Sequence, residues 1–179
     1  DPLAGATVLV LGAGGAGRAV AFGAAARGAR VLIANRDPGR ADALAADVTG
    51  AGLPGGPAAS VPLADVAAGR APADVLANTT SVGMATADAP GSAEETPVPG
   101  AALGRYRVVF DAVYTPLRTR LLTEAVAAGC VPVDGLAMFC GQAAAQFKLF
   151  TGVDPPAGVM RAHTRRRRTI SETSSPAII

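Results

Sequence analysis

A glycine-rich segment between an apolar run and an alanine-rich run constrains the fold of this chain more than any other feature. Residues 7–11 are apolar and rich in β-branched side chains, which is typical of a strand buried in a parallel sheet. The segment from Gly12 to Gly17 then contains the pattern G-x-G-x-x-G. Residues 15–28 are rich in alanine and free of proline, which predicts a helix that ends at Gly28. This order of strand, tight turn and helix is typical of the first unit of a doubly wound sheet.

The rest of the chain continues the alternation of strands and helices. Further strands are predicted at residues 30–34, about 59–61, 75–77, 107–112 and 131–133, and further helices at residues 38–48, about 117–128 and 136–151. Residues 50–62 are interpreted as a Gly/Pro-rich connection and residues 79–104 as a long loop. We therefore predict an α/β, Rossmann-type fold with a mainly parallel sheet and helices on both faces. In such a sheet a ligand binds beyond the carboxyl ends of the strands.

The length and charge of the chain indicate one domain followed by a tail. We predict a domain over residues 1–156 and a basic, Ser/Thr-rich, disordered tail over residues 157–179. The formal charge of +2 belongs to the tail, because without residues 161–179 the chain has 11 basic and 13 acidic side chains. The arginine run at 165–168 is compatible with contact to RNA, an anionic membrane or a targeting receptor. We expect instead a solvated end, and neither nucleic acid nor membrane as a partner.

The two cysteines predict neither a disulfide framework nor a metal site. Cys130 and Cys140 stand alone in apolar surroundings and are interpreted as small core residues. The sequence contains no run of about 18 apolar residues that would predict a membrane-spanning helix.

The glycine pattern predicts a phosphate-binding turn. The first glycine permits the tight turn, the second lets backbone approach a pyrophosphate, and the third lets helix and strand pack closely. The start of the helix then faces the anion. FAD, S-adenosylmethionine and the absence of any ligand stay open, but the strand before and the helix after the turn favour a dinucleotide.

The end of the second strand bears on which dinucleotide binds. NAD sites usually carry an acidic residue here, about 20 residues beyond the glycines, to accept hydrogen bonds from the ribose. This chain has Asn35 and Arg36 instead, with Arg40 one helical turn later. Paired guanidinium donors suit a 2′-phosphate, so NADP is predicted. The alternative is a pair of surface arginines near a helix start, where the helix dipole disfavours cations. The neighbouring Asp37 would weaken the preference for NADP.

Further motifs at the strand ends carry a resemblance to a known family. They are the segments 78–84 (NTTSVGM), 111–116 (DAVYTP) with Thr119 and Leu121-Leu122 after it, and 135–152 (GLAMFCGQAAAQFKLFTG). Together with GAGGAGRA at 12–19 and Asn35-Arg36, they resemble the C-terminal domain of shikimate dehydrogenases over most of residues 3–156. The last segment is especially similar to the plant bifunctional dehydroquinate dehydratase/shikimate dehydrogenases. Departures from the family pattern are Asp37, Thr86 where a proline is expected nearby, and the small Ala112.

The resemblance implies a site residue by residue. The pyrophosphate would lie on Gly12, Ala13, Gly14, Gly15 and Ala16, the 2′-phosphate on Asn35, Arg36 and Arg40, and the rest of the cofactor on Thr80, Ser81, Ala112, Gly135 and Met138. Tyr114 and Gln142 would contact the carboxylate and hydroxyls of the substrate. The alternatives are that Tyr114 is an interface aromatic and that Gln142 faces solvent.

The resemblance also implies the reaction, which is reduction of 3-dehydroshikimate by NADPH on the route to chorismate and the aromatic amino acids. The family's proton relay, a Lys and an Asp, belongs to an N-terminal substrate domain that no segment here matches. The only histidine, His163, lies in the predicted tail, and the only lysine, Lys148, lies inside a predicted helix. We therefore assign no catalytic residue and expect this chain alone to bind NADP without turnover.

Two other functions stay open at the level of sequence. One is a quinate dehydrogenase that uses NAD, and the other is a non-catalytic, nucleotide-binding regulatory module. The resemblance implies a plastid location if the plant-like similarity holds, and a cytoplasmic location otherwise.

Overall fold

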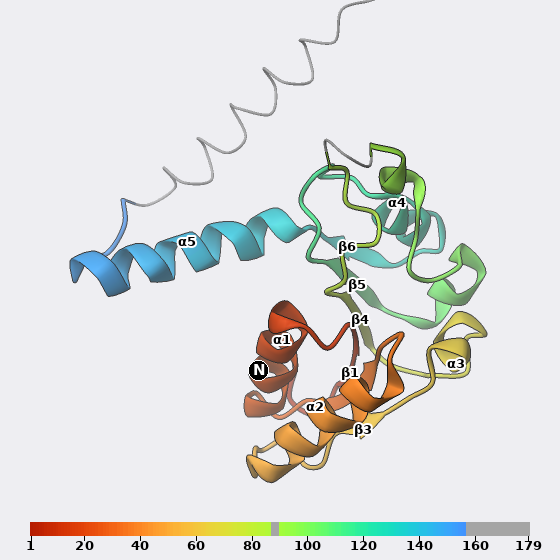
Figure 1. Cartoon of the computed structure of the whole chain (residues 1–179), viewed down its shortest axis with the longest axis horizontal. Helices are drawn as coiled ribbons and strands as arrows, with labels where there is room; N and C mark the ends of the chain where they lie inside the picture. Colours follow the sequence, from red (N-terminus) through yellow and green to blue (C-terminus); the bar gives the residue numbers. More distant parts are fainter. Residues whose placement is uncertain (87–89, 157–179) are drawn as a thin grey trace, which may run out of the picture. The chain divides into compact units, whose positions relative to one another are not determined.

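The chain is described by a computed structural model over residues 1–86 and 90–156 (Figure 1). The described residues form two compact units, Asp1–Gly135 and the part of Leu136–Ile179 that ends at residue 156. The tail predicted at residues 157–179, with His163 and the arginine run, lies outside the described residues.

The first unit is built on a six-stranded sheet in which each neighbouring pair of strands is parallel. The strands are β1 (Thr7–Leu11), β2 (Arg30–Ala34), β3 (Ala59–Ser60), β4 (Val75–Asn78), β5 (Val108–Asp111) and β6 (Val131–Val133), in the spatial order β3-β2-β1-β4-β5-β6. The strand order reverses between β1 and β4, which is the switch point where ligands of such sheets bind. The prediction of a doubly wound α/β fold is confirmed.

Helices cover both faces of this sheet. On one face lie α1 (Gly15–Ala26) and α2 (Pro38–Gly50), and on the other lie α3 (Leu63–Ala67), the 3₁₀ helix η2 (Gly100–Arg105) and α4 (Arg120–Ala127). A second 3₁₀ helix, η1 (Pro90–Glu94), precedes η2. The long helix α5 (Gly135–Thr151) makes up most of the described part of the second unit.

The core of the first unit follows from the alternation of side chains along β1. Val8 and Val10 pack with the alanines of α1 and with α2, whereas Leu9 and Leu11 pack into the cluster on the opposite face. Successive side chains of a strand point to opposite faces, so a strand covered on both sides must be apolar throughout. This is why β1 has no polar residue between Val8 and Leu11.

The structure corrects several predicted boundaries. The loop predicted at residues 79–104 contains η1 and η2, and α3 lies in a stretch for which no element was predicted. The helix predicted from residue 117 begins at Arg120, because Thr119 caps it with its side chain. Cys130 is buried in the core as predicted, but Cys140 is only half-buried and lies on α5, so its interpretation as a core residue is wrong.

Candidate functional site

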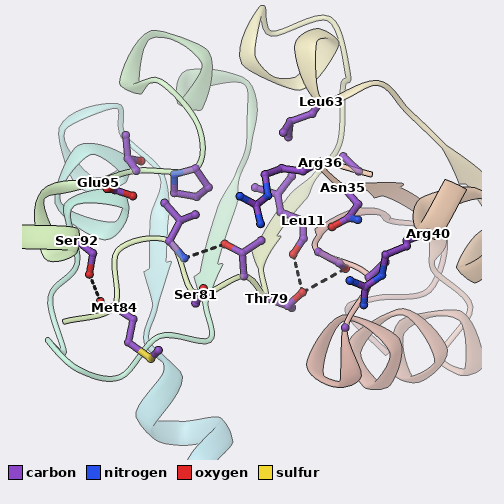
Figure 2. Close-up of a pocket in the computed structure, with 18 of the residues that line it drawn as sticks. Leu11, Asn35, Arg36, Arg40, Leu63, Thr79, Ser81, Met84, Ser92 and Glu95 are labelled. Atoms are coloured by element: carbon purple, nitrogen blue, oxygen red, sulfur yellow. Dashed lines mark hydrogen bonds between the residues drawn. The ribbon is translucent and has the colours of Figure 1, made fainter. Parts of the chain in front are cut away.

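A groove of about 780 Å³ lies along the carboxyl edge of the sheet in the first unit (Figure 2). It is lined by the segments that directly follow β1, β2 and β4, and by residues 92–97, which lie farther along the chain before η2. Of the predicted cofactor residues, those that line it are Gly12, Ala13, Gly14, Asn35, Arg36, Arg40, Thr80 and Ser81. The structure thus brings together three motifs that lie far apart in the sequence.

The glycine turn is packed tightly on one side and open on the other. Gly12 has a φ of +100°, and a Cβ there would lie 2.9 Å from Thr79 Oγ1. A Cβ at Gly17 would lie 2.1 Å from the carbonyl oxygen of Gly12. A Cβ at Gly14, by contrast, would have no atom within 4 Å. The first and third glycines of the motif therefore serve packing, and the middle one leaves space for a ligand at the start of α1.

The start of α1 can accept an anion. Gly14 is its N-cap residue and provides no side-chain acceptor, so no capping side chain satisfies the first N–H groups of the helix. Such N–H groups, together with the helix dipole, favour a phosphate. Gly15 and Ala16 belong to this first turn, but they are not among the residues that line the groove.

A hydrogen-bonded turn after β4 forms the floor of the groove. Thr79 Oγ1 donates to the carbonyl of Leu11 at 2.6 Å, which ties the ends of β4 and β1 together (Figure 2). Asn78 Oδ1 accepts from Thr80 N at 3.1 Å and from Thr80 Oγ1 at 2.7 Å. The Thr80 hydroxyl also accepts from Val82 N at 3.2 Å. These bonds fix the shape of the turn that predicted residues Thr80 and Ser81 share.

Two cations stand at the β2 end of the groove. Arg36 and Arg40 are exposed, and neither forms an ion pair with any residue that the structure describes. Asn35 lies beside them and donates from Nδ2 to the carbonyl of Asp37 at 3.1 Å. Guanidinium groups without a carboxylate partner can form paired, charge-assisted hydrogen bonds with a phosphate.

Asp37 has a structural role that its sequence position did not reveal. It is the N-cap of α2, where its Oδ1 accepts a hydrogen bond from Gly39 N at 3.0 Å. The carboxylate that seemed to oppose a phosphate is therefore hydrogen-bonded to the helix backbone.

A buried carboxylate joins β4 to β5 beneath the site. Asp111 is fully buried and accepts hydrogen bonds from Asn78 Nδ2 at 2.9 Å, Thr119 Oγ1 at 2.6 Å and Val113 N at 3.0 Å. Burial raises the pKa of Asp111, and the bonds from Thr119, Val113 and Asn78 offset part of that rise. Sequence reasoning found both motifs but missed this network, although Asn78 and Asp111 are direct partners across the sheet.

The wall of the groove farthest from Arg40 was also missed. It consists of Ser92, Glu95, Thr96 and Pro97, all from the segment predicted to be a plain loop. Met84, which also lines the groove, belongs to the motif at residues 78–84. Figure 2 shows Ser92 and Glu95 on one side of the groove and Asn35 and Arg40 on the other. Ser92 Oγ donates to the carbonyl of Met84. No periodicity or motif between Ser92 and Pro97 indicated that these residues would line a site.

The remaining predicted residues do not line this groove. Gly135 packs on Ala112, since a Cβ at Gly135 would lie 2.4 Å from the Ala112 carbonyl oxygen. Tyr114 is partly exposed, at 38%. Met138 and Gln142 lie on α5 in the second unit, where their spacing of four residues places them on one side of the helix. The roles predicted for these five residues stay predictions.

The described residues hold no cluster of three His, Cys, Asp or Glu side chains placed to bind a metal ion. No described helix combines the length and apolar character needed to cross a membrane.

Two family models match the chain. Residues 1–85 match the model described as shikimate/quinate 5-dehydrogenase. Residues 135–164 match the model described as the shikimate 5′-dehydrogenase C-terminal domain.

Curated relatives agree with these matches. The chloroplastic bifunctional 3-dehydroquinate dehydratase/shikimate dehydrogenase of Arabidopsis thaliana is 49% identical over 158 residues, which is 87% of this chain and 24% of the plant protein. The shikimate dehydrogenase (NADP⁺) of Halobacterium salinarum is 46% identical over 165 residues, which is 92% of this chain and 57% of the archaeal protein. The chain thus spans about half the length of the archaeal relative and a quarter of the plant one.

Solved structures give the same result. Shikimate 5-dehydrogenase from Thermus thermophilus, in complex with NADP(H) and shikimate, is 39% identical, with a TM-score of 0.74 over 92% of this chain and 56% of that one. Quinate dehydrogenase from Corynebacterium glutamicum, in complex with NAD, is 34% identical, with a TM-score of 0.76 over 90% of this chain and 55% of that one. Motifs, sheet order and relatives all agree, and the chain belongs to the shikimate dehydrogenase family.

Proposed function

We propose that this chain is the cofactor-binding part of an NADP-dependent shikimate dehydrogenase. The observation that carries the proposal is the presence of Arg36 and Arg40, which form no ion pair with any described residue, at the β2 end of the groove. The open helix start at Gly14 lies next along the same groove. A phosphate site beside a pyrophosphate site fits NADP.

The described residues would bind the cofactor as follows. The first N–H groups of α1, from Gly15 and Ala16 onward, would hold the pyrophosphate above the open space at Gly14. Arg36 and Arg40, with Asn35, would hold the 2′-phosphate. Thr80 and Ser81, which follow β4, would support the cofactor where it passes the ends of β1 and β4.

Nicotinamide supplies the hydride in this chemistry, and the protein orients the two reactants. Ala112, Gly135 and Met138 would approach the nicotinamide end. Tyr114 and Gln142 would donate to the carboxylate and hydroxyls of shikimate.

We assign no catalytic residue to this chain. A reduction of 3-dehydroshikimate takes a hydride from NADPH and a proton from a general acid, which the family draws from a Lys and an Asp in its N-terminal part. We expect the 179-residue chain to bind NADP without turning over shikimate. Reduction of NADP by shikimate, followed at 340 nm with the purified chain, would contradict this expectation.

NAD is the less favoured cofactor, although a structural relative was solved with it. A preference for NAD needs an acidic acceptor for the ribose hydroxyls at the end of the second strand. Asp37 is the only acidic residue in that stretch, and its carboxylate caps α2.

Calorimetric titration with NADP and NAD tests the cofactor proposal. We expect the wild-type chain to bind NADP more tightly than NAD. Arg36→Ala and Arg40→Ala should each weaken NADP binding by roughly tenfold to a hundredfold, as expected for a lost charge-assisted hydrogen bond. Binding of NAD should change little.

Arg107→Ala is the matched control. Arg107 is an exposed arginine just before β5, at the amino edge of the sheet and therefore opposite the groove. It should leave both affinities unchanged. Equal binding of the two nucleotides by the wild-type chain, or a loss of NADP binding in the control, would refute the phosphate site.

A plastid or a cytoplasmic location stays a prediction. One relative is a chloroplastic plant protein at 49% identity and others are archaeal, at 42–48% identity.

A further inference from the structure

The wall of the groove farthest from Arg40 lacks support from the sheet. It consists of Ser92, Glu95, Thr96 and Pro97, which we call the far wall, and it belongs to the segment from η1 to η2. None of these residues lies in a strand of the sheet, and within the wall Glu95 N donates to the carbonyl of Ser92 at 3.1 Å. At its ends, Ser92 bonds to Met84 and Thr96 Oγ1 donates to the carbonyl of the buried Val98 at 2.9 Å.

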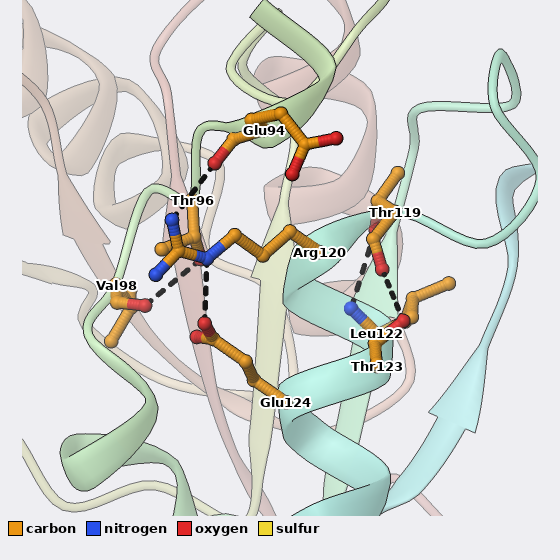
Figure 3. Close-up of polar contacts among 8 residues, drawn as sticks. All are labelled: Glu94, Thr96, Val98, Thr119, Arg120, Leu122, Thr123 and Glu124. Carbon is orange, nitrogen blue, oxygen red and sulfur yellow. Dashed lines mark hydrogen bonds and ion pairs between the residues drawn. The ribbon is translucent and has the colours of Figure 1, made fainter.

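The middle of the far wall is held by Arg120. Arg120 Nη1 donates to the carbonyl of Glu94 at 2.9 Å, directly before Glu95 (Figure 3). Its Nε donates to Glu124 Oε1 at 2.6 Å, one turn later on α4. Arg120 therefore joins the backbone directly before Glu95, a far-wall residue, to α4.

Glu124, whose side chain is 25% exposed, is the partner of Arg120 on α4. Its second oxygen, Oε2, is buried without a hydrogen-bond partner among the described residues. That oxygen packs against the start of η2, because a Cβ at Gly100 would lie 3.1 Å from it. The Arg120 guanidinium thus donates both to this carboxylate and to the carbonyl of Glu94.

The helix that carries this contact is itself tied to the sheet. Thr119 caps α4 by accepting from Leu122 N at 3.3 Å and donates to the buried Asp111 at 2.6 Å. A continuous series of bonds therefore runs from β5 through Thr119 and Arg120 to the far wall.

The ion pair between Arg120 and Glu124 contributes little to stability. The Arg120 side chain is 51% exposed, and an exposed ion pair between residues four apart on a helix contributes only about 0.3–0.5 kcal/mol. The bond to the Glu94 carbonyl, in contrast, decides where the next residue, Glu95, stands in the groove.

We propose that Arg120 is a positioning residue that holds the far wall against the part of the dinucleotide beyond the 2′-phosphate. The inference rests on the proposed function. The strand order supports it, because the far wall follows β4, whereas Arg36 and Arg40 follow β2 on the opposite side of β1. A ligand that ends at the adenosine half should therefore not need the far wall.

The test compares NADP with adenosine 2′,5′-bisphosphate, which retains the 2′-phosphate and lacks the nicotinamide half. We expect Arg120→Leu to weaken NADP binding by about tenfold, since a wall of several side chains must then be ordered by the ligand. Binding of the bisphosphate should stay within about twofold of wild type. Arg36→Ala should weaken both ligands, because both carry the 2′-phosphate.

Two further variants separate positioning from a general loss of structure. Glu124→Gln keeps the acceptor Oε1 and should retain NADP binding, whereas Glu124→Ala should weaken NADP as Arg120→Leu does. Arg107→Leu, the same change at an exposed site outside the groove, should have no effect on either ligand. Melting temperatures of all variants are measured alongside.

The binding measurements distinguish failure of the inference from failure of the proposed function. If the wild-type chain binds NADP and Arg120→Leu binds it equally well, the inference is wrong and the proposed function stands. If Arg120→Leu weakens both ligands in parallel with a lower melting temperature, Arg120 is merely structural and the inference is again wrong. If the wild-type chain binds neither ligand, the proposed function and the inference fall together.

Discussion

A Cβ atom at position 17 would lie 2.1 Å from the carbonyl oxygen of Gly12, so the first turn of α1 packs directly on the backbone of the glycine turn. That oxygen is backbone and cannot move without shifting the turn. We expect Gly17→Ala to lower the free energy of unfolding by about 1–3 kcal/mol, measured by urea denaturation.

Gly23→Ala is the control for this change, because Gly23 lies in the same helix, is exposed and has no atom within 4 Å of an added Cβ. It should raise the free energy of unfolding by about 0.5–1 kcal/mol, since alanine favours a helix over glycine. A Gly17→Ala chain as stable as wild type would contradict the packing described here.

The order of strands and helices could be predicted because the central strands are apolar on both faces up to their last residues. In β1, Val8 and Leu9 each meet a helical layer, so the strand appears in the sequence as an uninterrupted apolar run. The glycine turn adds a fixed geometry between β1 and α1. Both signals lie within short stretches of sequence, so the strands, the turn and the first helix can be predicted from the sequence alone.

The far wall and the Asp111 network could not be predicted, for the opposite reason. Asn78 and Asp111 are 33 residues apart, and nothing in either segment indicates that their side chains meet. The far wall depends on Arg120, whose bond to Glu94 spans 26 residues. The first contact follows from the register of β4 and β5, and the second from the way η1 and α4 pack, and the sequence displays neither.

The cap of α2 gives a prediction that separates stability from cofactor affinity. Asp37→Ala should lower the free energy of unfolding by about 1 kcal/mol, because Gly39 N loses its acceptor. Asp37→Ser should retain most of the stability, since serine also caps helices. It should also strengthen NADP binding by about threefold, because a negative charge beside the proposed phosphate site is gone.

Urea denaturation and calorimetry of both Asp37 variants measure the two effects. If Asp37→Ser binds NADP more weakly than wild type, then the carboxylate contributes to the nucleotide site and its assignment as a cap alone is wrong.

The raised pKa of Asp111 predicts a pH dependence with a definite sign. Burial raises the pKa of Asp111 in the folded protein above its value in the unfolded chain, which is about 3.9. Between these two pKa values the folded state keeps a proton that the unfolded state has released. The contribution of Asp111 to the free energy of unfolding is therefore largest at low pH and is lost as the pH rises through the folded pKa.

Asp111→Asn removes this titration while keeping the shape of the side chain. The difference in free energy of unfolding, wild type minus variant, should fall as the pH is raised from about 4 toward 7 in urea experiments. A difference that grows with pH would show that the bonds from Asn78, Thr119 and Val113 outweigh burial, so that the folded pKa lies below the unfolded one.

Thr119 should be among the most sensitive polar positions of the chain, because one hydroxyl serves two buried partners. Its Oγ1 donates to Asp111 Oδ2 at 2.6 Å and accepts from Leu122 N at 3.3 Å, and the residue is fully buried. Thr119→Val keeps the volume and removes both bonds, so we expect a loss of about 2–4 kcal/mol in the free energy of unfolding. Thr119→Ser keeps both bonds and removes one methyl group, which should cost no more than about 1 kcal/mol.

Urea denaturation of the two variants side by side measures the difference. Equal losses would mean that the methyl group, and not the hydroxyl, holds α4 to the sheet, and the link from β5 to Arg120 would then have to run through packing alone.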